Sequence, residues 1–155
     1  MTMEPRIDIG AATEPEREWA AQLMASSEPW ITLGRRIEAC RDACRRPETL
    51  LFVARDAGAA CGFILVHPRG LAGSPYIASV AVAESSRGLG LGTRLLDFAE
   101  NRFRPEARHI FLCVSSFNAR ARRLYERHGY EAVGELADYI IDGASEIVMH
   151  KWLRR

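Results

Sequence analysis

The fold of this chain is decided by the segment Val80-Ala81-Val82-Ala83-Glu84-Ser85-Ser86-Arg87-Gly88-Leu89-Gly90-Leu91-Gly92-Thr93-Arg94-Leu95-Leu96. Its first residues are apolar and rich in valine, which is typical of a strand, and its last residues are apolar at helical spacing. Three glycines stand at alternate positions between the two. The segment therefore predicts a strand that turns sharply into a helix, with a backbone bare of side chains at the turn.

The beginning of that helix is an expected anion site. Unpaired N–H groups and the positive end of the helix dipole meet there, and glycines let a ligand approach the backbone. Arg87 adds a positive charge, which favours a pyrophosphate over a single carboxylate. A purely structural role, in a tight connection that packs closely on the sheet, is the alternative, but three alternate glycines exceed what such a turn needs.

Two common phosphate-binding motifs are excluded at this turn. The spacing of Gly88, Gly90 and Gly92 differs from G-x-G-x-x-G, and no acidic residue ends the next strand to hold a ribose. A nucleoside-triphosphate loop needs Lys followed by Ser or Thr, whereas Thr93 and Arg94 follow the last glycine. The turn is therefore expected to bind the pyrophosphate of a different ligand.

Composition favours one globular domain over residues 1–155, with 48% hydrophobic and 26% charged residues. A net charge of +1 gives no field that would attract nucleic acid, and no apolar run approaches the ~20 residues that span a membrane. Without a signal-peptide pattern, a cytoplasmic protein is expected. The four cysteines lack a Cys-x-x-Cys pair and lie in apolar patterns, which predicts reduced thiols and no metal site.

The rest of the chain reads as a mixed α/β domain. Strands are expected over residues 6–10, 50–54, 62–66, 76–83, 109–114, 131–141 and 145–152, and helices over residues 13–26, 33–44, 91–99 and 118–128. Residues 68–75 are rich in helix and strand breakers, and Asp142-Gly143 is a hairpin signal. The order β-α-α-β-β-β-α-β-α-β-β predicts a central mixed sheet of six or seven strands with four helices, parallel in the middle and antiparallel at both ends.

Two motifs resemble the GNAT superfamily of acyl-CoA-dependent N-acyltransferases. The first is Arg87-Gly88-Leu89-Gly90-Leu91-Gly92, which matches the family pattern Arg/Gln-x-x-Gly-x-Gly/Ala after an apolar strand. The second is the Asn-x-x-Ala…Leu-Tyr-Glu-x-x-Gly-Phe/Tyr segment, which residues 118–130 match. The order of elements is also similar over nearly the full length. The chain is thus identified as a member, with some similarity to ribosomal-protein-alanine N-acetyltransferases.

The resemblance implies an acetyl-CoA donor, whose pyrophosphate sits on the glycine turn and whose pantetheine arm runs beside the preceding strand where two strands part. The implied donor-binding residues are Val80, Ala81, Val82, Arg87, Gly88, Leu89, Gly90, Leu91, Gly92, Thr93 and Asn118. A backbone N–H near Val82 would stabilise the oxyanion, and Tyr125 would protonate the departing thiolate. Helix packing alone would also explain Tyr125, and helix capping alone would explain Asn118.

The base that deprotonates the acceptor amine is left unassigned. The ribosomal-protein enzymes carry a glutamate where this chain has Cys113, and a thiol is a poor substitute at its ordinary pKa. No spacing argument places an alternative beside the amine. The other candidate bases are Glu28, Glu84, Asp138 and His128.

The acceptor is expected to be a primary amine, on a small molecule or at a peptide or protein N-terminus. Glu28 and Trp30 in the loop after the first helix, and Tyr139 in the final hairpin, supply a counter-charge and aromatic walls. Core or strand packing explains the two aromatic residues equally well. A sensor that binds acyl-CoA without turnover is the alternative function, and a homodimer is an expectation by family analogy only.

Overall fold

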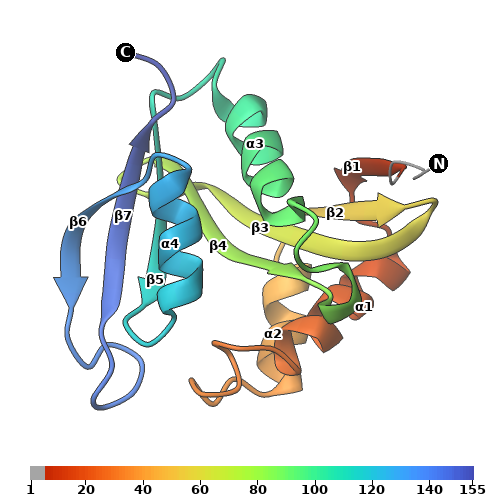
Figure 1. The fold of residues 1–155 in the computed structure, drawn as a ribbon, viewed down its shortest axis with the longest axis horizontal. Coiled ribbons are helices and arrows are strands. Elements are labelled where there is room, and N and C mark those ends of the chain that lie inside the picture. The colour runs from red at the N-terminus through yellow and green to blue at the C-terminus, as the bar shows by residue number, and fades with distance from the viewer. Residues whose placement is uncertain (1–5) are drawn as a thin grey trace.

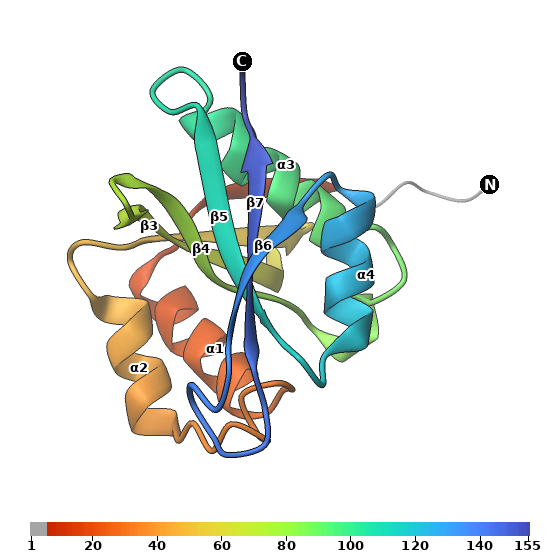
Figure 2. The same ribbon diagram turned by 90° about the vertical axis from the view of Figure 1, so that its left-hand side faces the viewer.

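The computed structural model describes residues 6–155 and contains one seven-stranded sheet with helices on both faces (Figures 1 and 2). The strands are β1 (Ile7–Ala11), β2 (Leu50–Asp56), β3 (Ala59–Leu71), β4 (Ser74–Val82), β5 (His109–Ser115), β6 (Glu131–Leu136) and β7 (Glu146–Trp152). The helices are α1 (Glu14–Ala25), α2 (Ile37–Arg45), α3 (Leu91–Phe103) and α4 (Ala119–Arg127), with a short 3₁₀ helix at Glu84–Ser86. Within these residues, no helix is both long and apolar enough to cross a membrane.

The topology is the expected one. The strand order is β1-β2-β3-β4-β5-β7-β6, and every neighbouring pair is antiparallel except β4 and β5, which are parallel. The strand–helix–strand connection through α3 therefore crosses over the sheet, as a parallel pair requires. The sequence of elements along the chain confirms the predicted order.

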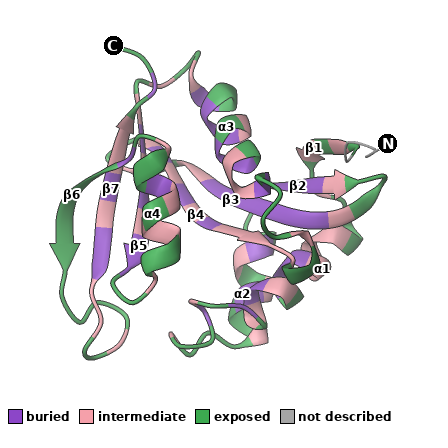
Figure 3. Ribbon diagram, viewed as in Figure 1, coloured by how far each residue is buried: buried purple, intermediate pink, exposed green. Residues whose placement is uncertain are grey.

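Two apolar cores lie on opposite faces of the sheet, and Figure 3 shows their buried stripes on strands and helices. Helices α1 and α2 pack on one face, where Cys40 and Cys44 lie fully buried as predicted. Helices α3 and α4 cover the other face, with Leu95 and Tyr125 among the buried residues. All four cysteines are unbridged. The sheet therefore lies between two helical layers, one on each face.

Strands β4 and β5 separate soon after they meet. They pair only at Tyr76↔Phe111 and Ile77↔Leu112. On the other side of β4, Leu65 opposes Ser79 while Val66 opposes Ile77, so Ala78 is an additional residue in β4. Such a bulge kinks a strand and raises its twist. The bulge at Ala78 therefore turns the second half of β4 away from β5 (Figure 1), which is the expected parting.

Two segments differ from the sequence predictions. The breaker-rich residues 68–75 are not a loop, because β3 and β4 continue through them to a tight turn with positive φ at Ala72 and Gly73. The register shifts between His67 and Leu71, and a bulge of this kind tolerates residues that lack an N–H donor. Strand β6 ends at Leu136 rather than residue 141, because the chain closes a local turn in which the Asp138 carboxylate accepts the Gly143 N–H at 2.7 Å.

An ion pair between Glu16 of α1 and Arg55 of β2 connects the first helix to the sheet. The Arg55 guanidinium donates two hydrogen bonds of 2.7 Å to the Glu16 carboxylate, which also completes a capping box with Thr13. Hydrogen bonding to Arg55 is the main reason that the pKa of Glu16 is lowered from 4.5 to about 2. A carboxyl whose pKa is lower in the folded protein than in the unfolded chain stabilises the fold at pH values above its unfolded pKa. That stabilisation is lost as the pH falls through the folded pKa.

We expect Glu16→Gln to lower the free energy of unfolding by about 1–2 kcal/mol at neutral pH. Glutamine can still complete the capping box, so the change isolates the charge. The difference from the wild type should shrink as the pH falls below 4.5 and disappear only below about pH 2, where Glu16 is protonated in both the folded and the unfolded state. Urea unfolding at a series of pH values measures this. Glu14→Gln, at an exposed position in the same turn, is the control and should change little. A loss that persists unchanged at pH 2 would contradict the ion-pair account.

Candidate active site

A groove of about 800 Å³ opens where β4 and β5 separate. Its walls come from β4, the glycine turn and the start of α3 on one side, and from the end of β5, α4 and the first residue of β7 on the other. The connection between α1 and α2 closes one end. The groove brings together most of the residues singled out in the sequence, namely Glu28, Trp30, Val80, Ala81, Val82, Arg87, Gly88, Gly90, Leu91, Gly92, Thr93, Asn118 and Tyr125.

Two predicted site residues lie outside the groove lining. Leu89 is 59% exposed at the tip of the glycine turn, and Tyr139 is 67% exposed in the loop after β6. The neighbour of Tyr139, Ile140, lines the groove instead. Trp30 is 6% exposed and packs on the core beneath α1 and α2, so its ring serves the core and the groove wall together.

The three glycines of the turn have two different functions. Gly88 and Gly90 have φ of +80° and +76°, and a Cβ placed on either would meet no atom of the described residues within 4 Å. They thus give the turn a left-handed backbone and leave the space beside it open. Gly92 lies inside α3, where a Cβ would approach the Leu124 side chain of α4 to 3.1 Å. Gly92 therefore brings the two helices close together, which the sequence pattern did not distinguish from the role of the first two.

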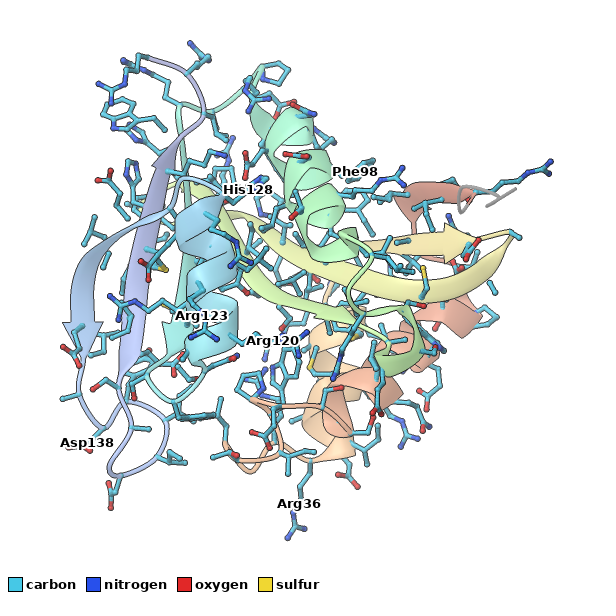
Figure 4. All side chains as sticks on the ribbon, in the orientation of Figure 1. Arg36, Phe98, Arg120, Arg123, His128 and Asp138 are labelled. Atoms are coloured by element: carbon cyan, nitrogen blue, oxygen red, sulfur yellow. The ribbon has the colours of Figure 1, made fainter. Side chains whose placement is uncertain are left out.

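Positive charge gathers at the glycine-turn end of the groove. Gly90 is the N-cap of α3 and has no side chain to satisfy the first N–H groups of the helix. The Arg87 side chain donates from Nε to the Val82 carbonyl at 3.2 Å, which holds it against the end of β4. Arg120 and Arg127 of α4 also line the groove, and Figure 4 marks Arg120 on that helix. Arg87 and the helix dipole make the turn suitable for a phosphate group, and Arg120 and Arg127 add positive charge to the groove wall.

Helix α4 presents Asn118 and Tyr125 to the groove. Asn118 is the N-cap of α4, with its Oδ1 accepting the Ala121 N–H at 3.3 Å, so the capping role is confirmed. Tyr125 is 8% exposed, and its ring lies edge-on to Tyr130 with 6.2 Å between centroids. Burial raises the pKa of Tyr125 above its usual value, so the phenol stays protonated at neutral pH and above.

A polar cluster lies at the end of the groove farther from the turn. Tyr76 of β4 and Cys113 of β5 both line the groove there, and burial raises the pKa of both side chains. The Ser115 hydroxyl donates to the buried Glu146 carboxylate at 2.6 Å. The sequence analysis missed Glu146, because only the β5–β7 register, Ser115↔Glu146, brings it to the groove.

The four candidate bases from the sequence do not all reach the groove. Glu28 lines it and accepts a hydrogen bond from Thr32, and Glu84 lines it next to the glycine turn. Asp138 lies at the outer end of the β6–β7 hairpin and His128 at the far end of α4 (Figure 4), and neither lines the groove. The structure therefore reduces the set from four residues to two and adds Glu146.

His128 belongs to a cluster that joins α3, α4 and β7. Its Nε2 lies 3.0 Å from Asp97 and 3.2 Å from Glu100, and these three residues have spacing that could hold a metal ion. However, the Lys151 ammonium lies 2.6 Å from the Glu100 carboxylate, which also accepts the Tyr130 hydroxyl at 3.1 Å. Glu100 is thus already compensated by a cation, and the cluster connects the elements of the fold.

The comparisons with known proteins agree with the motifs and the fold. The chain is 39% identical over 102 residues to an uncharacterised N-acetyltransferase of Methanocaldococcus jannaschii, and the match spans 64% of each chain. A crystal structure of a GNAT-family acetyltransferase from Desulfovibrio desulfuricans superposes with a TM-score of 0.82 at 19% identity, over 95% of this chain and 99% of that one.

Two further solved structures share the fold. An aminoglycoside 6′-N-acetyltransferase complexed with coenzyme A superposes with a TM-score of 0.77 at 19% identity, over 96% of this chain and 98% of that one. The ribosomal-protein-S18-alanine N-acetyltransferase from Escherichia coli gives 0.76 at 18% identity, over 96% and 95%. The model of the acetyltransferase (GNAT) family matches residues 13–130, which include the parted strand β4, the glycine turn and helix α4. On this match and on the fold, the chain belongs to the GNAT family of acetyltransferases.

Proposed function

We propose that this enzyme transfers the acetyl group of acetyl-CoA to a primary amine, on a small molecule or at the N-terminus of a peptide or protein. The observation that carries the proposal is the single groove that joins the glycine turn, the parted strands and Tyr125. The name of the Methanocaldococcus relative supports an amine acceptor, and the coenzyme A complex of a protein with the same fold supports the donor.

The groove offers suitable partners to each part of the donor. The pyrophosphate would bind the N–H groups at the start of α3, beside Arg87 and the open faces of Gly88 and Gly90. The pantetheine arm would lie along β4 from Val80 to Val82, where that strand has left β5 and its edge can pair with amides. Ser79 lines the groove and is 5% exposed, and its hydroxyl has no hydrogen-bond partner among residues 6–155, so a bound donor can satisfy it.

The chemistry proposed for these residues is direct attack of the amine on the thioester. A backbone N–H near Val82 stabilises the negative charge that develops on the carbonyl oxygen. Tyr125 gives its proton to the thiolate as the C–S bond breaks, and the raised pKa keeps that proton available. Glu28 and Trp30 border the end of the groove that would receive the acceptor.

Calorimetry and a thiol-release assay test the proposal. We expect the wild type to bind acetyl-CoA and to bind acetyl-pantetheine, which lacks the pyrophosphate, more weakly. CoA release is then measured with polyamines, amino acids, aminoglycosides and short peptides with varied N-termini, and at least one amine should accelerate it. Absence of acyl-CoA binding would contradict the proposal. Tight binding without release by any amine would support an acyl-CoA sensor instead.

A further inference from the structure

Glu146 is a buried carboxylate at the acceptor end of the groove. It is the first residue of β7 and pairs with Ser115, the last residue of β5. It is 8% exposed, lines the groove and accepts one hydrogen bond of 2.6 Å, from the Ser115 hydroxyl. The Ser115 hydrogen bond fixes the carboxylate while leaving further lone pairs for a second donor.

The charge of Glu146 has no counterpart among residues 6–155. No lysine, arginine or histidine of that range lies within 4.0 Å of its carboxylate. Glu100, the other deeply buried glutamate, has Lys151 at 2.6 Å. Burying a carboxylate without a cation is costly, so a cationic ligand bound beside Glu146 would gain free energy from compensating it. An ammonium group, with three N–H donors and a positive charge, fits that requirement.

The neighbours of Glu146 cannot take a proton from an amine. Tyr76 of β4 and Cys113 of β5 line the same groove, and burial raises the pKa of both, so both side chains keep their protons at neutral pH. Across the groove, Glu28 is exposed and already accepts the Thr32 hydroxyl at 2.5 Å, and Arg35 is a cation. Glu84 follows β4 near the glycine turn, at the donor end. Glu146 is therefore the buried, pre-positioned carboxylate at the acceptor end.

We propose that Glu146 binds the ammonium group of the acceptor and accepts its proton, so that the acceptor is an amine that reaches the enzyme as a cation. This inference rests on the proposed acetyl transfer. Glu146 takes one proton from R–NH₃⁺, and the neutral nitrogen forms a bond to the thioester carbonyl carbon. When the C–S bond breaks, the thiolate takes the Tyr125 proton, and the second proton of the nitrogen restores the phenol. Glu146 then releases its proton to water.

Glu146→Gln tests the proposal, because glutamine keeps the size of the side chain and can still accept from Ser115. The probes are ethylamine, a cation at neutral pH, and 2,2,2-trifluoroethylamine, which has the same chain length and is largely neutral. They are assayed beside the most active amine of the panel. We expect kcat/KM for ethylamine to fall by about 100-fold and that for trifluoroethylamine much less, since a neutral amine needs no base. The Kd of acetyl-CoA should stay within about twofold.

The pH profile gives a second readout. The wild type should show a plateau in kcat/KM, because the carboxylate binds and deprotonates the cation. The variant should instead rise about tenfold per pH unit, following the fraction of free amine. Glu135→Gln is the matched control, because Glu135 is an exposed carboxylate on β6, beside Ile147 of β7 and outside the groove lining, and this variant should keep the wild-type profile. Equal losses with the two amines, or an unchanged rate and profile in Glu146→Gln, would overturn the inference. A wild type that acetylates no amine would instead overturn the proposed function, and this inference with it.

Discussion

Replacing Tyr125 by phenylalanine is expected to lower kcat by at least about 100-fold and to change the Kd of acetyl-CoA by no more than about twofold. The ring is buried in the core beneath α4, so its packing is kept and the donor groove retains its shape. Only the proton for the departing thiolate is lost. Steady-state kinetics together with calorimetry separate the two effects. Because burial raises the pKa of Tyr125 from 10.0, ionisation of this phenol should not reduce wild-type activity below pH 10.

Tyr130→Phe is the matched control. Tyr130 is also buried and lies next to Tyr125, but its hydroxyl donates to Glu100 and it does not line the groove. We expect this variant to lose about 1 kcal/mol of stability and to keep kcat within a few-fold of the wild type. Full activity in Tyr125→Phe would contradict the acid role and assign Tyr125 to packing alone.

Gly90→Ala should weaken acetyl-CoA binding by about tenfold or more. The new methyl group would occupy the open space beside the turn, and loss of one hydrogen bond to a charged group costs about 1.5–3 kcal/mol. Alanine at a φ of +76° also strains the backbone, which lowers the stability of the folded variant by about 1 kcal/mol. Calorimetry with acetyl-CoA and thermal unfolding measure the two consequences separately.

Gly73→Ala is the control that shows the effect of backbone strain on stability without an effect on donor binding. Gly73 has φ of +78° and also faces open space, but it lies in the turn between β3 and β4, outside the groove lining. The two variants should therefore lose similar stability, and only Gly90→Ala should lose affinity. Equal Kd values for the two variants would show that the turn does not approach the donor.

The elements around the glycine turn were predictable because their signals are local. The apolar strand, the alternate glycines and the spacing from Arg87 to Gly92 all lie within a few residues of one another, and the structure places a strand, a turn and a helix there. Asn118 was likewise predictable as a helix cap from its position before α4. The burial of Cys40 and Cys44 was predicted from their helical spacing alone, and both are buried.

The acceptor end depends on contacts between distant residues, which a pattern along the chain does not record. Glu146 reaches the groove only because β7 pairs with β5, and its partner Ser115 is 31 residues away. The bulge at Ala78 has no characteristic residue, so the parting of β4 and β5 was expected from the family resemblance and not from this stretch of sequence. Tyr139 was predicted to border the acceptor as an aromatic residue of the final hairpin, whereas β6 ends at Leu136 and Tyr139 lies exposed outside the groove lining.

The bulge at Ala78 makes the groove a permanent property of the folded chain. One added residue in β4 separates it from β5, and the ladder between these strands stops after Ile77↔Leu112. The two strands are thus already separated when the chain has folded, because β4 carries one residue more than β3 at the bulge. A donor that enters finds a preorganised site, and its binding free energy is not reduced by the cost of pulling two hydrogen-bonded strands apart.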